Sequence, residues 1–472
     1  MTIKGKHFYL IGIKGVGMTM LAQFLAKQGA RVSGSDVRET FLTDRVLKKQ
    51  GIPVYSPPQA SNIPEDPEVI VYSSAYHEKN NPELAFIKKS KQRFAKIPLL
   101  SYAEALATVF NDYTGIAVCG SHGKTSVTAW LGYVLQAAGL DPNVLVGSFV
   151  PQLQGSARLG TSDYFLAEVD EYQNKLQYFQ PFGVLLNNIS YDHPDFFPTQ
   201  AAYTKVFRDF IKKIPPQGFL VLNFDDNLSK AVSQSNQGRL ITYGILEDKA
   251  VRPKVDYVAH GLRVDRAWQV FSVNNLGEFK IRLSGRHSIY NALAVIAAAK
   301  ELQVPLEKIR TALAEFRGTD RRAQKLGTYQ GAIIIDDYAH HPQEIVSTLA
   351  GLRQFYPNKE IIVAFHPHTY TRTKALFADF VTSFTEADEL IVLDIYGSAR
   401  EKQGGTSSRK LVTAIAKHNQ QTGKSQRLMQ LPGIAETAGY LKGRASQGQV
   451  IVLMGAGDVF RVAEIILNKG IK

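Results

Sequence analysis

Residues 115–126 read GIAVCGSHGKTS, an apolar strand that runs directly into a glycine-rich turn. Because a helical pattern begins near Val127, the turn is predicted to lie between a strand and a helix. Backbone N–H groups of such a turn, together with the helix N-terminus, form a cradle for anions. We interpret the stretch as a phosphate-binding loop. A chance glycine turn is the alternative, because Val118 stands where the full P-loop pattern has a further glycine.

Three side chains of this turn carry the expected chemistry. Lys124 would reach the β- and γ-phosphates of a nucleotide, and the hydroxyl group of Thr125 or Ser126 would meet Mg²⁺. The sequence therefore predicts a site for a nucleoside triphosphate and a magnesium ion.

Carboxylates gather at the end of the next predicted strand of this segment, Tyr164–Ala167. Glu168, Asp170 and Glu171 follow it, and three carboxylates are costly to place together without a cation. Mg²⁺ is the natural partner beside a P-loop, and a solvated acidic turn is the alternative. His193 follows the strand after that. We interpret it as a second metal ligand or a substrate contact, with a structural loop histidine as the alternative.

A second glycine-rich turn, residues 12–17, follows the predicted strand His7–Ile11 near the N-terminus. Asp36 lies 19 residues after Gly17, at the end of the next strand, where an acceptor for a ribose hydroxyl belongs. The order of the glycines differs from the dinucleotide fingerprint, which argues against an ordinary NAD site. A tight packing turn without a ligand is the alternative.

Strands alternate with helices along most of the chain, which predicts an α/β fold with parallel sheets. With 472 residues, about three domains are expected, and we place them at 1–112, 113–322 and 323–472. A short antiparallel excursion is predicted within 250–284, and an alanine-rich helix is predicted to begin near Tyr290. The predicted strands are His7–Ile11, Arg31–Ser33, Glu68–Tyr72, Gly115–Cys119, Tyr164–Ala167, Val184–Asn187, Phe219–Asn223, Ala332–Ile335, Glu360–Phe365, Glu389–Leu393 and Gln449–Leu453.

Composition narrows the class of protein. Hydrophobic residues make up 44% and charged residues 21%, as in a globular chain. The net charge of +13 is spread over all three segments without a basic, aromatic-rich stripe, so we expect no nucleic-acid partner. A single cysteine excludes an intrachain disulfide, and no run of 18 apolar residues occurs. We therefore expect a cytoplasmic protein that does not enter a membrane.

Polar side chains also follow strands in the last segment. Open α/β sheets bind ligands at the carboxyl ends of their strands, so these residues are expected to meet at the mouth of one sheet. An isolated histidine is usually structural, but several histidines together with aspartates and an arginine at one edge of a sheet favour a binding site. The residues are Asp336, Asp337, His340, His341, His368 and Arg372.

Taken in order, these motifs resemble the Mur ligase family, and the resemblance runs from residue 7 to residue 458. It is closest to the branch of the family that adds alanine. The stretches that carry it are Gly12–Met18, Gly34–Asp36, Gly120–Ser126, Glu168–Tyr172, Tyr191–Asp195, Asp336–Pro342 and His366–Thr373.

The resemblance implies a Rossmann-like N-terminal domain that binds a UDP-substrate, a central P-loop ATPase-like domain that binds ATP, and a Rossmann-like C-terminal domain that brings an amino acid. It implies ATP- and Mg²⁺-dependent ligation of L-alanine to the lactyl carboxylate of UDP-N-acetylmuramate, through an acyl phosphate, in the synthesis of peptidoglycan precursors. Monomers or weak homodimers are expected.

The resemblance also implies roles for individual residues. Lys124, His193 and Arg372 would be catalytic. Arg321 or Arg322 would approach the phosphates, and Asn291 would contact adenine. ATP would be bound by Gly120, Ser121, His122, Gly123, Lys124, Thr125, Ser126, Asn291, Arg322 and Asp337. The UDP-substrate would be bound by Gly15, Gly17, Asp36, Ser73 and His122, the amino acid by His368 and Arg372, and the metal by Thr125, Glu168 and His193.

Two alternatives remain open from sequence. A related ligase that joins UDP-N-acetylmuramate to a preformed tripeptide uses the same nucleotide-sugar, so the N-terminal motifs do not separate the two. The stretch from His368 to Arg372 favours the alanine enzyme. A basic P-loop ATPase acting on nucleic acid is disfavoured by the even spread of charge.

Overall fold

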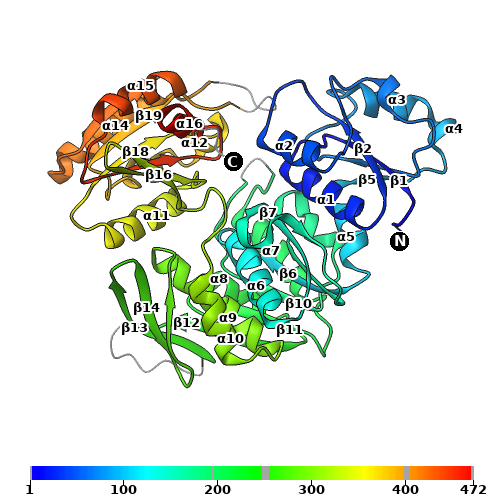
Figure 1. Cartoon of the computed structure of the whole chain (residues 1–472), viewed down its shortest axis with the longest axis horizontal. Coiled ribbons are helices and arrows are strands. Elements are labelled where there is room, and N and C mark those ends of the chain that lie inside the picture. The colour runs from blue at the N-terminus through cyan, green and yellow to red at the C-terminus, as the bar shows by residue number, and fades with distance from the viewer. Residues whose placement is uncertain (1–2, 194–195, 247–254, 398–403, 469–472) are drawn as a thin grey trace.

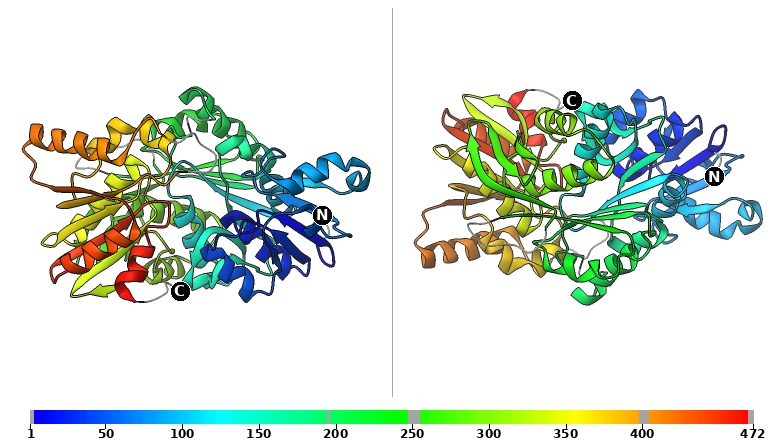
Figure 2. Two further views of the ribbon diagram at one scale, coloured as in Figure 1. Left: turned by 90° about the horizontal axis from the view of Figure 1, so that it is seen from above. Right: turned by 90° about the horizontal axis from the view of Figure 1, so that it is seen from below.

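The computed structural model describes residues 3–193, 196–246, 255–397 and 404–468. Pro194 and Asp195 of the Tyr191–Asp195 motif lie outside this part. The described residues form three sheets, each covered by helices, which lie around a common centre (Figure 1). The views from above and below place the N-terminal and C-terminal parts on opposite sides of the molecule (Figure 2). The three-domain α/β fold expected from the sequence is confirmed.

The N-terminal sheet is parallel, with the strand order β3-β2-β1-β4-β5. The side chains of β1 are all buried, as expected for a central strand with helices on both faces. Its strands are β1 (His7–Ile11), β2 (Arg31–Ser35), β3 (Val54–Tyr55), β4 (Val69–Tyr72) and β5 (Leu99–Ser101). Its helices are α1 (Val16–Lys27), α2 (Leu42–Lys49), α3 (Pro82–Lys89), α4 (Lys91–Phe94) and α5 (Tyr102–Phe110).

The central sheet has ten strands in the order β15-β14-β13-β12-β11-β10-β6-β9-β7-β8. Its middle is parallel, whereas β13, β14 and β15 pair antiparallel, which confirms the excursion predicted within 250–284. The strands are β6 (Thr114–Cys119), β7 (Asn143–Val150), β8 (Gly155–Arg158), β9 (Tyr164–Glu168), β10 (Gly183–Leu186), β11 (Phe219–Asn223), β12 (Arg239–Ile245), β13 (Tyr257–Asp265), β14 (Trp268–Val273) and β15 (Gly277–Ile281).

The helices of the central part include α9, in which the stretch Ala292–Ala299 is apolar on all sides and buried, as is typical of an interior helix segment. The others are α6 (Lys124–Ala138), α7 (Gln200–Ile211), α8 (Asn227–Ser233) and α10 (Leu306–Glu315), and α9 spans Arg286–Glu301. Short 3₁₀ segments are η1 (Ala60–Asn62) in the N-terminal part and η2 (Pro151–Leu153) and η3 (Tyr172–Tyr178) here.

The C-terminal sheet has the order β16-β17-β21-β18-β19-β20, with β16 alone antiparallel. Its strands are β16 (Gln324–Tyr329), β17 (Ala332–Asp337), β18 (Glu360–Phe365), β19 (Glu389–Leu393), β20 (Arg427–Leu431) and β21 (Gln449–Met454). Its helices are α11 (Pro342–Phe355), α12 (Tyr370–Ala375), α13 (Phe377–Thr382), α14 (Ser408–Thr422), α15 (Ile434–Arg444) and α16 (Arg461–Leu467).

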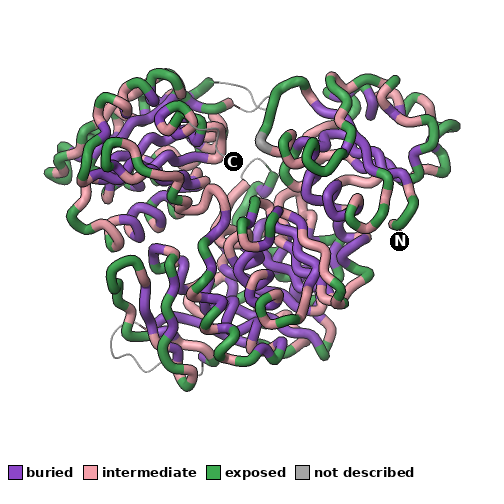
Figure 3. The backbone as a smooth tube through the Cα atoms, in the orientation of Figure 1, coloured by how far each residue is buried: buried purple, intermediate pink, exposed green. Residues whose placement is uncertain are grey.

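Buried residues fill the space between each sheet and its helices, while the outer helix faces are exposed (Figure 3). Side chains join the parts: Gln23 Nε2 donates to Ser156 Oγ over 3.0 Å, and Lys27 Nζ donates to the carbonyl oxygen of Ala157 over 2.8 Å. Within the described residues, no helix is both long and apolar enough to cross a membrane.

Some element ends differ from the sequence prediction. Helix α6 begins at Lys124 instead of near Val127, because Gly123 at φ +83° ends the turn one residue before it. Helix α9 begins at Arg286 instead of near Tyr290. Asp336 and Asp337 belong to β17 itself and do not lie past its end, because both pair in register with β21.

Candidate active site

The phosphate-binding turn between β6 and α6 is held tightly by its neighbours. The N–H group of His122 donates to Asn188 Oδ1 over 2.9 Å, and Ser121 Oγ donates to the carbonyl oxygen of Ser190 over 2.7 Å. A Cβ atom at Gly120 would lie 2.7 Å from the Asn188 carbonyl oxygen, and one at Gly123 would lie 2.7 Å from Asn291 Oδ1. Both glycines have positive φ, so this turn requires glycine at these positions.

Lys124 lies at the first position of α6 with its ammonium group turned back over the turn. Its Nζ atom donates to the carbonyl oxygen of Gly120 and to Glu171 Oε2, the latter over 3.1 Å. Burial alone would lower the pKa of Lys124, but the carboxylates of Glu171 and Asp170 raise it above its ordinary value. The residue therefore carries its positive charge where a phosphate would lie.

Glu168 ends β9 beside the turn and has features of a metal ligand. It accepts hydrogen bonds from the Thr125 hydroxyl and from the N–H of Gly147, but its Oε2 atom is buried without a hydrogen-bond partner. A Cβ atom at Gly147 would lie 1.8 Å from Glu168 Oε1, so glycine keeps this space open for the carboxylate. Burial raises the pKa of Glu168, which a bound cation would reverse. Thr125 and Glu168 therefore fit a magnesium ion.

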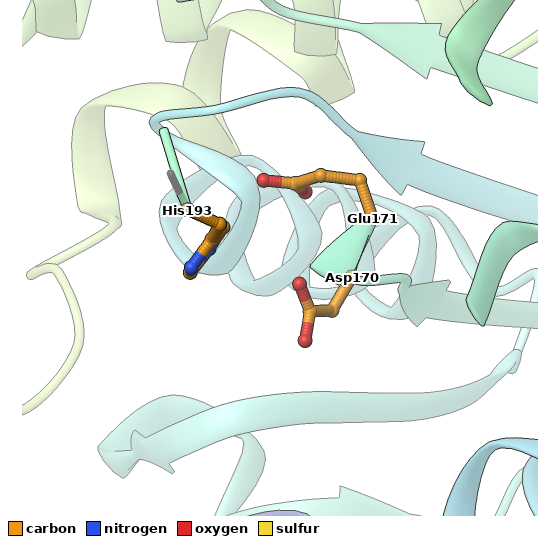
Figure 4. Close-up of side chains that lie close together, drawn as sticks. All are labelled: Asp170, Glu171 and His193. Carbon is orange, nitrogen blue, oxygen red and sulfur yellow. The ribbon is translucent and has the colours of Figure 1, made fainter. Parts of the chain in front are cut away.

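His193, the third predicted metal residue, lies with Asp170 and Glu171, and one ligand atom from each lies within 4.8 Å of the others (Figure 4). Both carboxylates already have cationic partners. Asp170 Oδ2 accepts from Lys175 Nζ over 2.7 Å, and Glu171 is paired with Lys124. The imidazole packs on Tyr172 at 4.5 Å between ring centroids.

A cavity lies between the central and C-terminal parts. Six of the ten residues predicted to bind ATP line it: His122, Gly123, Ser126, Asn291, Arg322 and Asp337. Asp337 accepts hydrogen bonds from the N–H groups of Ala323 and Ala339 over 2.7 and 2.8 Å, which fixes the chain where it crosses between the two domains. Burial raises the pKa of Asp337, and Arg322 opposes this rise.

Glu344 faces the same cavity from the first turn of α11. Its Oε1 atom lies 3.2 Å from His122 Nδ1, its Oε2 atom accepts from the N–H groups of His340 and His341, and Arg322 Nη1 lies 3.9 Å away. Burial opposes ionisation, yet His340, His122 and Arg322 hold the pKa of Glu344 well below its usual range. The phosphate-binding turn is therefore bonded to the C-terminal domain through a carboxylate.

Arg372 and His368, the predicted amino-acid site, lie at the start of α12. Arg372 Nη1 is 3.4 Å from His368 Nδ1, and Arg372 Nη2 is 3.9 Å from Asp192 Oδ1 on the central domain. Burial opposes ionisation of Asp192, but His193 and Arg372 lower its pKa to about 2. Thr369 adopts φ +71°, and its hydroxyl accepts a hydrogen bond from the N–H of Arg372. The backbone is therefore strained at the residue that caps the helix carrying Arg372.

Asp36 fixes the N-terminal glycine-rich turn. Its Oδ2 atom accepts from the N–H of Lys14 over 2.8 Å, and its Oδ1 atom accepts from the N–H of Val37 and the hydroxyl of Tyr76, each over 2.8 Å. A carboxylate oxygen accepts up to two hydrogen bonds, so Oδ2 keeps capacity for one ribose hydroxyl.

The other residues predicted for the UDP-substrate lie at two places. Ser73 packs beside Gly12, where an added Cβ would lie 2.8 Å from the Ser73 Cβ atom. Gly15 is the residue before α1, and Gly17 lies in its first turn against Tyr102. His122 instead lines the cavity toward the C-terminal domain and contacts Glu344. A second hollow runs from Gly17 to Lys124 and Glu168 between the N-terminal and central domains.

Comparison with known proteins decides the family. The chain matches the Mur ligase family catalytic domain over residues 7–114, the Mur ligase middle domain over 118–299 and the Mur ligase glutamate ligase domain over 321–457. The chain belongs to the Mur ligase family.

Full-length relatives within the Mur ligase family are similar to this chain. A UDP-N-acetylmuramate–L-alanine ligase of Desulfitobacterium hafniense (strain Y51) is 38% identical, covering 98% of this chain and 99% of the relative. The enzyme of the same name from Aquifex aeolicus (strain VF5) is 36% identical, covering 98% of each chain. The crystal structure of UDP-N-acetylmuramate-alanine ligase from Thermotoga maritima matches with a TM-score of 0.80 at 25% identity over 98% of both chains.

Sequence reasoning missed three residues of this Mur ligase site. Glu344 could have been found from the pattern His341-Pro342-x-Glu344, in which the glutamate closes a capping box. Lys175 pairs with Asp170 only because η3 turns back toward the carboxylates. Tyr203, whose hydroxyl donates to Glu171 Oε1 over 2.8 Å, lies in a helical pattern without any distinguishing signal.

Proposed function

We propose that this chain joins L-alanine to the lactyl carboxylate of UDP-N-acetylmuramate with the conversion of ATP to ADP and phosphate. The observation that carries the proposal is the position of the phosphate-binding turn. One side of it, His122, Gly123 and Ser126, lines the cavity toward the C-terminal domain, and Lys124 lines the hollow toward the N-terminal domain. ATP in the cavity and UDP-N-acetylmuramate in the hollow would therefore meet at this turn. UDP-N-acetylmuramate is the acceptor, because its carboxylate accepts the phosphate group. The names of the full-length relatives support the same substrates.

The reaction would proceed in two steps. A carboxylate oxygen of the acceptor attacks the γ-phosphorus of ATP, the bond to the ADP oxygen breaks, and an acyl phosphate forms. The amine of alanine then attacks the acyl carbon, loses a proton, and phosphate leaves with the electron pair of the broken carbon–oxygen bond. Both steps bring anions together, so positive charge at the turn is essential.

Lys124 supplies part of this charge, because its half-buried side chain lies beside the turn and the carboxylates of Glu171 and Asp170 raise its pKa. Mg²⁺, when held by Thr125 and Glu168, would offset the charge of the phosphates, and His193 would face a second ion. Asn291 would contact adenine and Arg322 would approach the phosphates. Asp337 would receive a ribose hydroxyl through acceptor capacity left beyond its two backbone bonds.

The amino acid would enter from the C-terminal domain. The guanidinium of Arg372 offers a planar pair of donors that matches the α-carboxylate of alanine, and His368 lies beside it. Asp192 of the central domain lies on the other side of the guanidinium, with its Oδ1 atom 3.9 Å from Arg372 Nη2.

The UDP part would be held by the N-terminal domain, at Gly15, Gly17, Asp36 and Ser73. His122 was predicted to help there, but its contacts favour a role toward ATP. Because ATP is a co-substrate, we place the reaction in the cytoplasm. We further propose that the chain acts as a monomer or weak homodimer, without a nucleic-acid or membrane partner.

The test is release of phosphate from ATP in the presence of UDP-N-acetylmuramate and each of the twenty amino acids, with the tripeptide as an alternative amine substrate. We expect the highest kcat/KM with L-alanine. Greater activity with the tripeptide would assign the chain to the peptide-adding reaction, and stimulation by DNA in place of the nucleotide-sugar would reject a ligase.

A further inference from the structure

Two lysines line the hollow between the N-terminal and central domains. Gly17, Met20 and Tyr102 line it from the N-terminal side, and Lys124 and Lys175 line it from the central side. Lys124 belongs to the phosphate-binding turn. Lys175 belongs to η3, which follows the acidic stretch Glu168–Glu171, and nothing in the phosphate chemistry described above uses it.

Lys175 is held firmly in this position. Its Nζ atom donates to Asp170 Oδ2 over 2.7 Å and lies 5.3 Å from the centroid of the Tyr172 ring, and its side chain is only 14% exposed. The two residues before it, Gln173 and Asn174, both adopt left-handed backbone angles, with φ of +57° and +56°. Such angles are costly for residues other than glycine, so the backbone before Lys175 is strained.

The pairing of the lysines and carboxylates that line the hollow indicates a role for Lys175. Lys124 is paired with Glu171 and Lys175 is paired with Asp170, while Glu168 Oε2 has no hydrogen-bond partner. A carboxylate that entered the hollow would face the carboxylates of Glu168 and Asp170, and like charges close to one another repel strongly. An ammonium group has three N–H donors, and Asp170 accepts one from Lys175, so donors remain for an incoming anion.

We propose that Lys175 binds the lactyl carboxylate of the acceptor and holds it beside Lys124 before phosphate transfer. This inference rests on the proposed function, because it names the residue that recognises the acidic end of that substrate. Lys124 then contacts the γ-phosphate and Lys175 contacts the attacking carboxylate, so each anion of the first step is paired with its own lysine.

The experiment compares two nucleotide-sugars that differ only in the lactyl ether that carries the carboxylate. Calorimetry measures binding of UDP-N-acetylmuramate and of UDP-N-acetylglucosamine, which lacks the lactyl ether, to the full chain with a non-hydrolysable ATP analogue and Mg²⁺. We expect Lys175→Met to weaken the first about 10- to 150-fold, as for loss of a charged hydrogen bond, and the second less than about threefold. Lys175→Arg should restore much of the difference. Lys205→Met, which removes a lysine paired with Asp209 on the exposed face of α7, is the matched control.

A second variant separates direct binding from simple neutralisation of Asp170. In Lys175→Met/Asp170→Asn the repelling carboxylate is gone as well. If Lys175 contacts the substrate, the preference for the lactyl sugar stays lost in the double variant. Recovery of wild-type affinity in the double variant, or equal affinity of Lys175→Met and wild type for both sugars, would overturn the proposal. Failure of the wild-type chain to release phosphate with UDP-N-acetylmuramate and alanine would instead reject the proposed function.

Discussion

His122 Nδ1 lies 3.2 Å from Glu344 Oε1, and this contact joins the phosphate-binding turn of the central domain to the first turn of α11 in the C-terminal domain. The two residues are 222 positions apart in the chain. Glu344 also accepts from the N–H groups of His340 and His341, so one carboxylate connects the turn to the segment that follows β17. The C-terminal domain is therefore joined to the turn by a specific charged contact.

Glu344→Gln should weaken this contact between the central and C-terminal domains. An amide keeps the shape but loses the charge that His122, His340 and Arg322 face, and a charged hydrogen bond contributes about 1.5–3 kcal/mol. We expect kcat/KM for ATP to fall about 10- to 150-fold and the radius of gyration in X-ray scattering with an ATP analogue to increase. Glu386→Gln, at a partly exposed carboxylate that pairs with Arg353 within the C-terminal domain, is the control. An unchanged scattering curve together with wild-type kinetics would show that Glu344 does not hold the two domains together.

Lys124→Ala should abolish ligation while the fold remains intact. Its charge is needed most as negative charge develops during phosphate transfer, so turnover should fall by at least on the order of 10²-fold. The measurement is phosphate release at saturating ATP, with circular dichroism to check the fold. Near-normal turnover would contradict the assignment of the phosphate-binding turn.

Glu168→Gln should shift the magnesium dependence of activity to higher concentration. Glutamine fits beside Gly147 but carries no charge, so cation affinity falls while the N-terminal nucleotide site is untouched. A magnesium titration of activity, together with calorimetry of UDP-N-acetylmuramate, checks both halves of this expectation. Superimposable titrations of variant and wild type would show that Glu168 is not a ligand.

Arg372→Lys should raise KM for alanine with little effect on KM for ATP or UDP-N-acetylmuramate. Lysine cannot form the paired contacts of a guanidinium with a carboxylate, a loss of roughly 2–3 kcal/mol or about 30- to 150-fold in kcat/KM for alanine. Arg409→Lys on α14 is the control. Alanine kinetics equal to wild type, or a tripeptide that outcompetes alanine in the wild-type chain, would favour the peptide-adding reaction.

His341 should make stability depend on pH. Burial, and then the neighbouring His122, lowers its pKa to about 4, and its neutral Nδ1 atom accepts from the N–H of Gln343 as the cap of α11. A histidine with a lowered folded-state pKa contributes stability above its unfolded pKa near 6.5, and this is lost as pH falls toward 4.

His341→Asn retains a capping side chain and removes this titration. Between pH 6.5 and 4 the free energy of unfolding of the variant should therefore fall less steeply than that of wild type, by up to about 1.4 kcal/mol per pH unit. Urea denaturation at several pH values measures the slope. Parallel slopes would show that His341 is not held neutral in the folded chain.

Much of the architecture could be predicted from local patterns. The strand β1 and the strands β18 and β19 were predicted with their observed bounds, because apolar runs of five or six residues between turn signals have few other interpretations. Small strands such as β3, with two residues, carry no such pattern and were missed. The predicted starts of α6 and α9 lie three to four residues too late in the sequence. Each helix begins directly after a glycine with positive φ, and the pattern of apolar residues does not indicate such a start.

The sequence by itself determined the local geometry of the turn at residues 120–124, because the turn lies in a contiguous strand–turn–helix and its positive φ angles fall on Gly120 and Gly123. Only the tertiary structure decided how the charges are paired: Lys124 with Glu171, Lys175 with Asp170, and His122 with Glu344. These pairs depend on how separate strands and domains pack, and a buried charge takes whichever partner the packing brings within reach. The order of residues along the chain carries no direct record of that choice.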